Sequence, residues 1–341
     1  MIYLVIFFFF FLSSIIEFLG DKKSAYVLLI LSCSILLIIT TFREGIGTDY
    51  YNYKEIFHEV TQKHIYSTEY GFTLLNLFAG FVGGFRVTLF LSALINLSCI
   101  LFVLRKLRLN ISLGVLTYYS LFYLNHNFNT IRHGLMCTLV WVGFYFYLNR
   151  EKLKSILYIS LGFMFHHVAL AVLPFQFLAR KKINIFISCI LLISFYIIGS
   201  LMQNAFTTVN FFFTSDKLEY YQNDFYSEGI LRYEFGLGFV LYVFIYFIVL
   251  KFNKYLRNGE AIIFLNNILF LGIAVILVFA SVSIFVERIA NVLLISLVFI
   301  FASLNRLRLG SMYKLGVLIL ICFINFFYLY KVMNLAGVDR E

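Results

Sequence analysis

Long apolar runs separated by short groups of basic residues dominate this chain and restrict it to a membrane-helix fold. The first two runs, Tyr3–Leu19 and Ala25–Phe42, have the length and composition of membrane spans. Hydrophobic residues make up 62% of the chain and charged residues only 13%, which is typical of an integral membrane protein. Because no series of short alternating strands is present, we expect an all-α polytopic helix bundle.

The basic groups predict how the spans are oriented. A net charge of +10 could indicate nucleic-acid binding, but the lysines and arginines flank the apolar runs, so we expect no nucleic-acid partner. Placing every basic group in the cytoplasm requires an even number of crossings between neighbouring groups. This gives about ten full spans in a single membrane domain, 1–341, with outer loops at 43–69 and 202–234.

Three segments need special treatment. Tyr70–Val82 is too short to cross upright and is predicted to be re-entrant or tilted. Ser155–Ala179 has basic groups at both ends, which favours two half-length helices that meet near His166 and His167. A short outer turn is expected from Asn125 to His133, with the next span starting at Gly134.

A polar cluster follows the second apolar run and is the first candidate site. Arg43 could bind an anionic group, and Asp49 could accept a proton. Tyr50 and Tyr53 could stack on sugar rings. The alternative is an arginine that anchors the membrane interface beside a glycine-rich turn, and the sequence leaves both interpretations open.

Two further arginines stand at the ends of apolar runs. Arg132, followed by His133, is placed where a span restarts, and a helix N-terminus already favours anions. Arg288 follows Glu287 between two apolar runs and is a third candidate phosphate ligand. Both could instead be structural charges at span ends.

The histidine pair and the second outer loop complete the candidates. His166 could be a proton acceptor near neutral pH, although a histidine in an apolar stretch is often a hydrogen-bonded core residue. The loop that ends at Arg232 mixes acidic and aromatic residues, which suits carbohydrate binding or simply a solvated loop.

Several chemistries lack their sequence patterns. No GxxxxGK[ST], HExxH or GxSxG motif is present, and the five cysteines are scattered singly through apolar runs. We therefore expect no cofactor, no metal site and no disulfide framework. The cysteines are Cys33, Cys99, Cys137, Cys189 and Cys322.

In this order, the polar clusters resemble the EpsG family of bacterial exopolysaccharide proteins, within the wider Wzy group of O-antigen and capsule polymerases. The segments that carry the resemblance are Arg43 with Gly47–Tyr53, Glu69–Phe72, Ile131–Gly134, Phe165–His166 and Glu287–Arg288. The family usually has Arg-Gln where this chain has Arg132-His133, which weakens any role for His133.

The resemblance implies a membrane glycosyltransferase related to C-type membrane glycosyltransferases. Such an enzyme polymerises undecaprenyl-diphosphate-linked oligosaccharides at the outer leaflet of the bacterial inner membrane, within membrane lipid, and the resemblance allows a chain-length regulator as a partner. Asp49 and His166 are then the catalytic candidates. The substrate-binding candidates are Arg43, Arg132, Arg288, Tyr50, Tyr53, Glu69, Arg232 and His133.

Three arginines around one diphosphate would stabilise the leaving group without a metal. The alternatives are a flippase or exporter of lipid-linked oligosaccharide, which would need a polar central passage, and an O-antigen ligase, which would need a larger outer loop.

Overall fold

The computed structural model describes residues 2–63, 68–181, 183–209, 235–252, 259–280, 286–308 and 310–335, and within them the fold is all helical, without a strand. The predicted fold class, a polytopic helical membrane protein, is confirmed. The α-helices are α1 (Ile2–Leu19), α2 (Lys22–Phe42), α3 (Tyr50–His58), α4 (Tyr70–Val82), α5 (Phe85–Lys106), α6 (Ile111–Tyr118), α7 (Ile131–Leu148), α8 (Lys152–Phe165), α9 (Val168–Leu178), α10 (Ile185–Val209), α12 (Leu237–Phe252), α13 (Gly259–Val278), α15 (Asn291–Leu294), α16 (Ser296–Ala302) and α17 (Ser311–Leu335).

Six of these helices are long and apolar enough to cross a membrane: α1, α2, α5, α7, α13 and α17. The shorter apolar helices include α4, α9 and α12. The described chain forms two compact units, residues 1–173 with 297–341 and residues 174–296. The predicted single membrane domain, 1–341, and the outer position of its loops stay predictions.

The interruption predicted near His166 is confirmed. Helix α8 ends at Phe165, His166 has an extended backbone, and α9 begins at Val168. The His166 and His167 carbonyls accept the first backbone hydrogen bonds of α9, from the N–H groups of Ala169 and Leu170. The segment is therefore two short helices, as its length and flanking charges indicated.

The predicted turn from Asn125 to His133 is wrong. Helix α6 continues into two π-helices, η2 (Tyr119–Tyr123) and η3 (Asn125–Asn129), and α7 starts at Ile131, so only Thr130 separates the two arms. At this junction the Thr130 N–H donates to the Asn125 carbonyl at 2.8 Å. π-Helices are rare and are frequently found at functional sites.

A buried carboxylate fixes the start of α6. Both oxygens of Glu17, from α1, accept backbone N–H groups of α6, from Ile111 at 3.0 Å and Ser112 at 2.8 Å. The Asn110 side chain caps the same end by accepting from the Leu113 N–H at 2.8 Å. An anion is favourable at a helix N-terminus, so these contacts anchor the segment that leads to η2 and η3.

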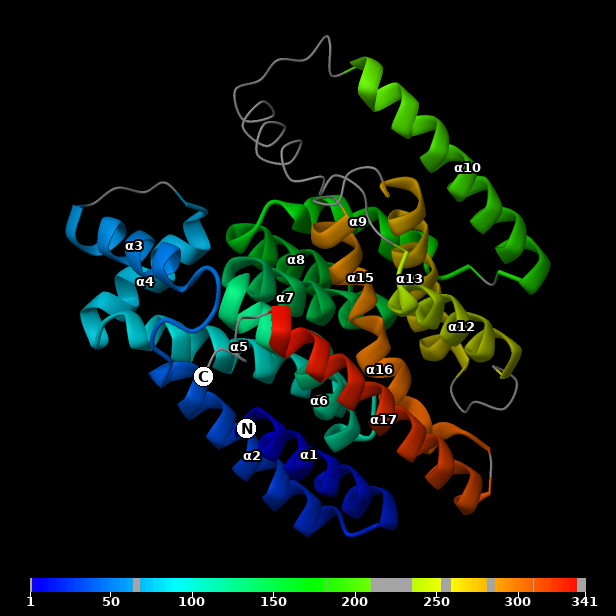
Figure 1. Cartoon of the computed structure of the whole chain (residues 1–341), viewed down its shortest axis with the longest axis horizontal. Coiled ribbons are helices and arrows are strands. Elements are labelled where there is room, and N and C mark those ends of the chain that lie inside the picture. The colour runs from blue at the N-terminus through cyan, green and yellow to red at the C-terminus, as the bar shows by residue number, and fades with distance from the viewer. Residues whose placement is uncertain are drawn as a thin grey trace. The chain divides into compact units, whose positions relative to one another are not determined.

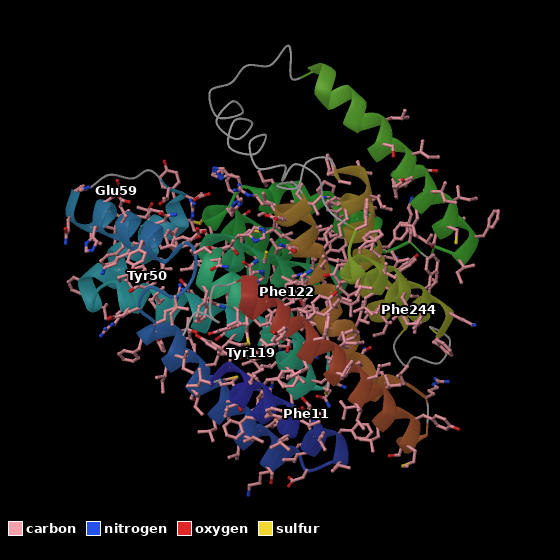
Figure 2. The ribbon with its side chains drawn as sticks, viewed as in Figure 1. Phe11, Tyr50, Glu59, Tyr119, Phe122 and Phe244 are labelled. Carbon is pink, nitrogen blue, oxygen red and sulfur yellow. The ribbon has the colours of Figure 1, made fainter. Side chains whose placement is uncertain are left out.

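Aromatic side chains fill the interior of the first unit. Helices α1 and α2 run antiparallel beside each other along its edge (Figure 1). Tyr119 lies among the helices (Figure 2), and its hydroxyl donates to the Tyr3 carbonyl at 2.8 Å. The Tyr123 hydroxyl is 2.8 Å from the Thr40 hydroxyl. Tyr119 and Tyr123 thus each combine a packed ring with a hydrogen-bonded hydroxyl.

Candidate active site at the start of helix α7

Arg43, the first residue after α2, points into the protein. Its guanidinium group donates to the backbone carbonyls of Asn127 at 2.9 Å, Phe128 at 3.1 Å and Ile46, and its carbon lies 4.4 Å from the centre of the Phe128 ring. The side chain is only 3% exposed, and burial lowers the pKa of Arg43 to about 10, which still leaves it charged at neutral pH. Arg43 therefore holds the loop 43–49 against η3.

Gly47 allows this loop to approach η3 closely. Its φ of +103° is rare for other residues, and a Cβ there would lie 2.5 Å from the Phe128 carbonyl oxygen. The next residue continues the attachment, because the Thr48 N–H donates to Oδ1 of Asn129 at 3.1 Å. The glycine-rich segment thus fits against the protein itself.

Asp49 follows at the N-cap position of α3, where its carboxylate makes no capping hydrogen bond. The side chain is partly buried. Burial raises the pKa of Asp49, and the positive charge of Arg132 partly opposes this effect. A partly buried carboxylate near a guanidinium group suits a proton acceptor.

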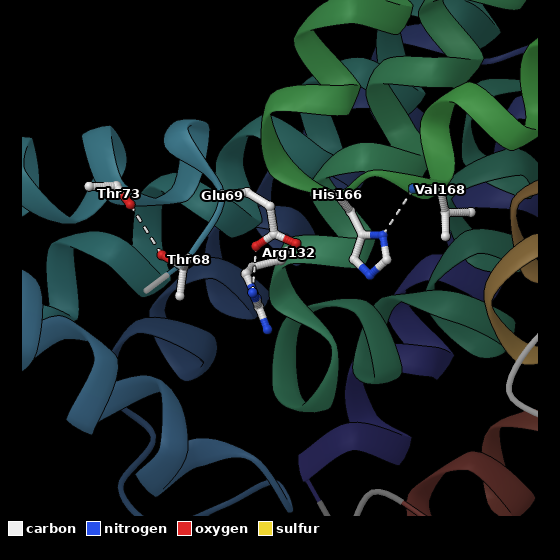
Figure 3. A network of polar contacts seen from close by, with 6 residues as sticks. All are labelled: Thr68, Glu69, Thr73, Arg132, His166 and Val168. Atoms are coloured by element: carbon white, nitrogen blue, oxygen red, sulfur yellow. Dashed lines mark hydrogen bonds and ion pairs between the residues drawn. The ribbon is translucent and has the colours of Figure 1, made fainter. Parts of the chain in front are cut away.

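Arg132 is the second residue of α7 and pairs with Glu69, which precedes α4. Nη1 of Arg132 lies 2.5 Å from Oε2 of Glu69, and both side chains are mostly buried. Figure 3 shows this pair with His166 drawn beside it. The prediction that Arg132 stands at the start of a helix is confirmed, although α7 begins three residues before the expected Gly134.

Gly71 allows Glu69 to lie close enough to pair with Arg132. A Cβ on Gly71 would lie 2.8 Å from the carbonyl oxygen of Met164, so only glycine lets the first turn of α4 contact the last turn of α8. This contact brings Glu69 and His166, which are far apart in the sequence, to the same end of α7.

His166 and His133 lie against each other, with ring centres 5.5 Å apart and an edge-to-face geometry. Nδ1 of His166 accepts from the Val168 N–H at 3.3 Å, which orients the ring. His133 is buried, His166 is partly buried, and the neighbouring His167 is exposed. Of the adjacent pair His166 and His167, only His166 thus faces the site at the start of α7.

Tyr50 and Tyr53 are predicted to stack on sugar rings, but both side chains are buried in the protein. Tyr50 and Tyr53 are buried in a hydrophobic cluster with Phe72 and Ile131, so protein covers their rings. Burial raises the pKa of Tyr53, and Arg132, which hydrogen-bonds its hydroxyl, opposes the shift. Tyr51, between them, is 68% exposed and is the tyrosine of this helix that a ligand can reach.

Two candidates do not belong to the described part of the first unit. Arg288 is an exposed residue of the π-helix η5 (Val286–Ala290) in the second unit, so its convergence with Arg43 and Arg132 stays a prediction. Arg232 falls outside the described residues.

Sequence reasoning missed a buried amide network behind the site. The Asn96 amide nitrogen donates to Oδ1 of Asn127 at 2.9 Å, and the Thr138 hydroxyl donates to Oδ1 of Asn96 at 2.8 Å. The Asn127 amide in turn donates to the Tyr123 carbonyl at 2.9 Å. An asparagine such as Asn96, in the middle of an apolar run, was the available signal, because a polar group there needs a partner.

Comparison with known proteins gives one family match. No curated protein and no solved structure matches the chain. The model of the EpsG family matches residues 26–339, nearly the whole chain, and therefore covers all the candidate site residues. The family suggests a glycosyltransferase-like polymerase role in exopolysaccharide biosynthesis. The chain is thus a helical membrane protein that belongs to the EpsG family.

Proposed function

We propose that this protein polymerises oligosaccharide repeat units carried on a lipid diphosphate, undecaprenyl diphosphate, at the outer leaflet of the bacterial inner membrane. The product would be an exopolysaccharide, capsule or O-antigen chain. Family membership supports the polymerase class. The observation that carries the site assignment is Arg132, held by Glu69 at the first turn of a membrane-length helix, with Asp49 and His166 around it.

The start of α7 is suited to a phosphate group for two reasons. Thr130 does not cap the first turn with its side chain, and although the Tyr53 hydroxyl accepts from the Arg132 N–H, the positive end of the helix dipole still favours an anion there. Arg132 also has an Nε group without a hydrogen-bond partner, while Nη1 is bound to Glu69. Glu69 and the Tyr53 hydroxyl therefore hold part of the guanidinium group, and the buried Nε keeps one donor that a diphosphate oxygen could use.

In the proposed reaction, an acceptor sugar hydroxyl attacks the anomeric carbon of the lipid-linked chain. The bond from that carbon to the diphosphate oxygen breaks, and its electron pair stays on the diphosphate, where Arg132 stabilises the new charge. Losing one such charge-stabilising contact typically costs about 3–4 kcal/mol of transition-state stabilisation.

The proton of the acceptor hydroxyl needs a base, and Asp49 is the better-supported candidate. It makes no capping hydrogen bond, and its raised pKa makes it a stronger base than an exposed aspartate. In this proposal His166, whose Nδ1 accepts from the Val168 N–H, orients the acceptor sugar. Arg43 contributes by fixing the loop that carries Asp49.

Deletion of the gene in its host, followed by analysis of surface polysaccharide, tests the proposal. A polymerase loss leaves single repeat units, an exporter loss leaves none, and a ligase loss leaves full-length chains on the lipid carrier. Complementation with Arg132→Ala should leave single repeats at normal protein level. Arg86→Ala, which removes an exposed arginine paired with Glu44 in the same unit, should restore long chains. Normal polymer from Arg132→Ala would overturn the site assignment.

A further inference from the structure

Behind the first turn of α7, three buried side chains form a group with no role in the proposed reaction. They are His126 from η3 and His133 and Cys137 from α7. One ligand atom from each lies within 4.8 Å of the others, and the Cys137 sulfur is 3.5 Å from Nδ1 of His133. His126 is 1% exposed and Cys137 is fully buried.

The backbone is shaped to bring these residues together. His133 and Cys137 are four residues apart and share one face of α7. His126 comes from the π-helix, and a Cβ on Gly134 would lie 2.6 Å from its Cβ, so glycine at position 134 lets the two segments touch. The buried Nε2 of His126 has no hydrogen-bond partner. An unpartnered buried nitrogen is costly, and a bound ion would satisfy it.

We propose that His126, His133 and Cys137 bind one transition-metal ion that prefers nitrogen and sulfur ligands, of the class of Zn²⁺ or Cu⁺. Imidazole and thiolate are the ligands that such ions select, and no carboxylate belongs to the group, which disfavours Mg²⁺ and Ca²⁺. Metal–ligand bonds of about 2.0–2.3 Å require the three atoms to close in by about 1 Å, within the range of side-chain rotation. On binding, the Cys137 thiol releases its proton and the two neutral histidines each donate a nitrogen lone pair.

Tyr118 supplies the outer support that such sites use. Its hydroxyl lies 3.2 Å from Nδ1 of His126, so it would accept from Nδ1–H when Nε2 binds the ion. A hydrogen bond to the second nitrogen of a histidine ligand fixes its tautomer and orientation.

The ion would join η3 to α7. η3 carries the carbonyls that hold Arg43, and α7 carries Arg132. The role of the ion is therefore structural. The proposed metal site depends on the geometry of the three side chains and not on the proposed polymerase activity.

Metal analysis of the detergent-purified protein tests this directly. After chelation, the protein is loaded separately with Zn²⁺ and with Cu⁺, and bound metal is measured by mass spectrometry; Co²⁺ is used as a spectroscopic probe. We expect one ion per chain and a thiolate-to-Co²⁺ absorption band. Cys137→Ser, His126→Ala and His133→Gln should lose the ion, whereas Cys99→Ser should retain it. Tyr118→Phe should weaken binding by about 10–100-fold.

A second variant guards against misfolding of Cys137→Ser. A chain in which the other four cysteines are serine keeps Cys137 as the sole thiol. It should still show the Co²⁺ band and lose it on chelation. Absence of that band, or retention of the ion by Cys137→Ser, would overturn the proposed site whatever the fate of the polymerase assay.

Discussion

Replacing Arg43 by alanine distinguishes a structural role of this arginine from a role in binding substrate. The change removes donors from three backbone carbonyls, those of Ile46, Asn127 and Phe128, at a side chain that is 3% exposed. Leaving a buried acceptor unpaired costs about 1–3 kcal/mol, and entry of water recovers part of this. We therefore expect a loss of about 3–5 kcal/mol of stability, and a fall in melting temperature of about 5–10 °C in detergent.

The assay is thermal unfolding of purified protein, with Arg86→Ala as the matched control. Arg86 pairs with Glu44 on the surface, and both side chains are more than half exposed, so its loss should change stability by about 0–1 kcal/mol. If Arg43→Ala melts like the wild type yet makes no polymer, the guanidinium group acts on substrate and the attachment to η3 is not its function.

Three further changes test the site. Because burial raises the pKa of Asp49, its base form is lost as pH falls through that raised value, so polymerisation should decline at a higher pH than for an exposed aspartate. The same raised pKa means that protonation of Asp49 favours the folded state. Asp49→Asn should therefore abolish polymer while slightly raising the melting temperature at pH 7. Gly71→Ala should separate α4 from α8 and reduce polymer length in a gel assay, because its Cβ would lie 2.8 Å from the Met164 carbonyl oxygen, whereas Gly236→Ala, which meets no neighbour, should not. Tyr51→Ala should weaken apparent acceptor affinity by about 0.5–1.5 kcal/mol without a change in melting temperature, and a stability loss would instead show a packing role.

The sequence predicts the helices well because their signals are local. Length and flanking charge located the interruption at His166, and the polar break before an apolar run located Arg132 at a helix start. The short helix α4 spans Tyr70–Val82, the segment expected from the sequence. Each of these features depends on a few neighbouring residues.

The direction of side chains was harder to predict. Arg43, Tyr50 and Tyr53 stand in a polar segment, yet all three point inward, because a loop pressed against η3 can satisfy a guanidinium group with backbone carbonyls. Apolar periodicity also gives no sign of a π-helix, which adds one residue to a turn and thereby carries His126 to the face of Cys137. Such placements depend on contacts between segments distant in the sequence.

The division of one segment into α8 and α9 has a consequence for how the protein is made. A helix of 14 residues is only about 21 Å long, so α8 cannot cross about 30 Å of hydrocarbon by itself, and the peptide groups at its end would meet lipid unprotected. The helices that contact it, α4 and α7, are both synthesised earlier. Insertion of this segment therefore requires that α4 and α7 are already assembled in the bilayer.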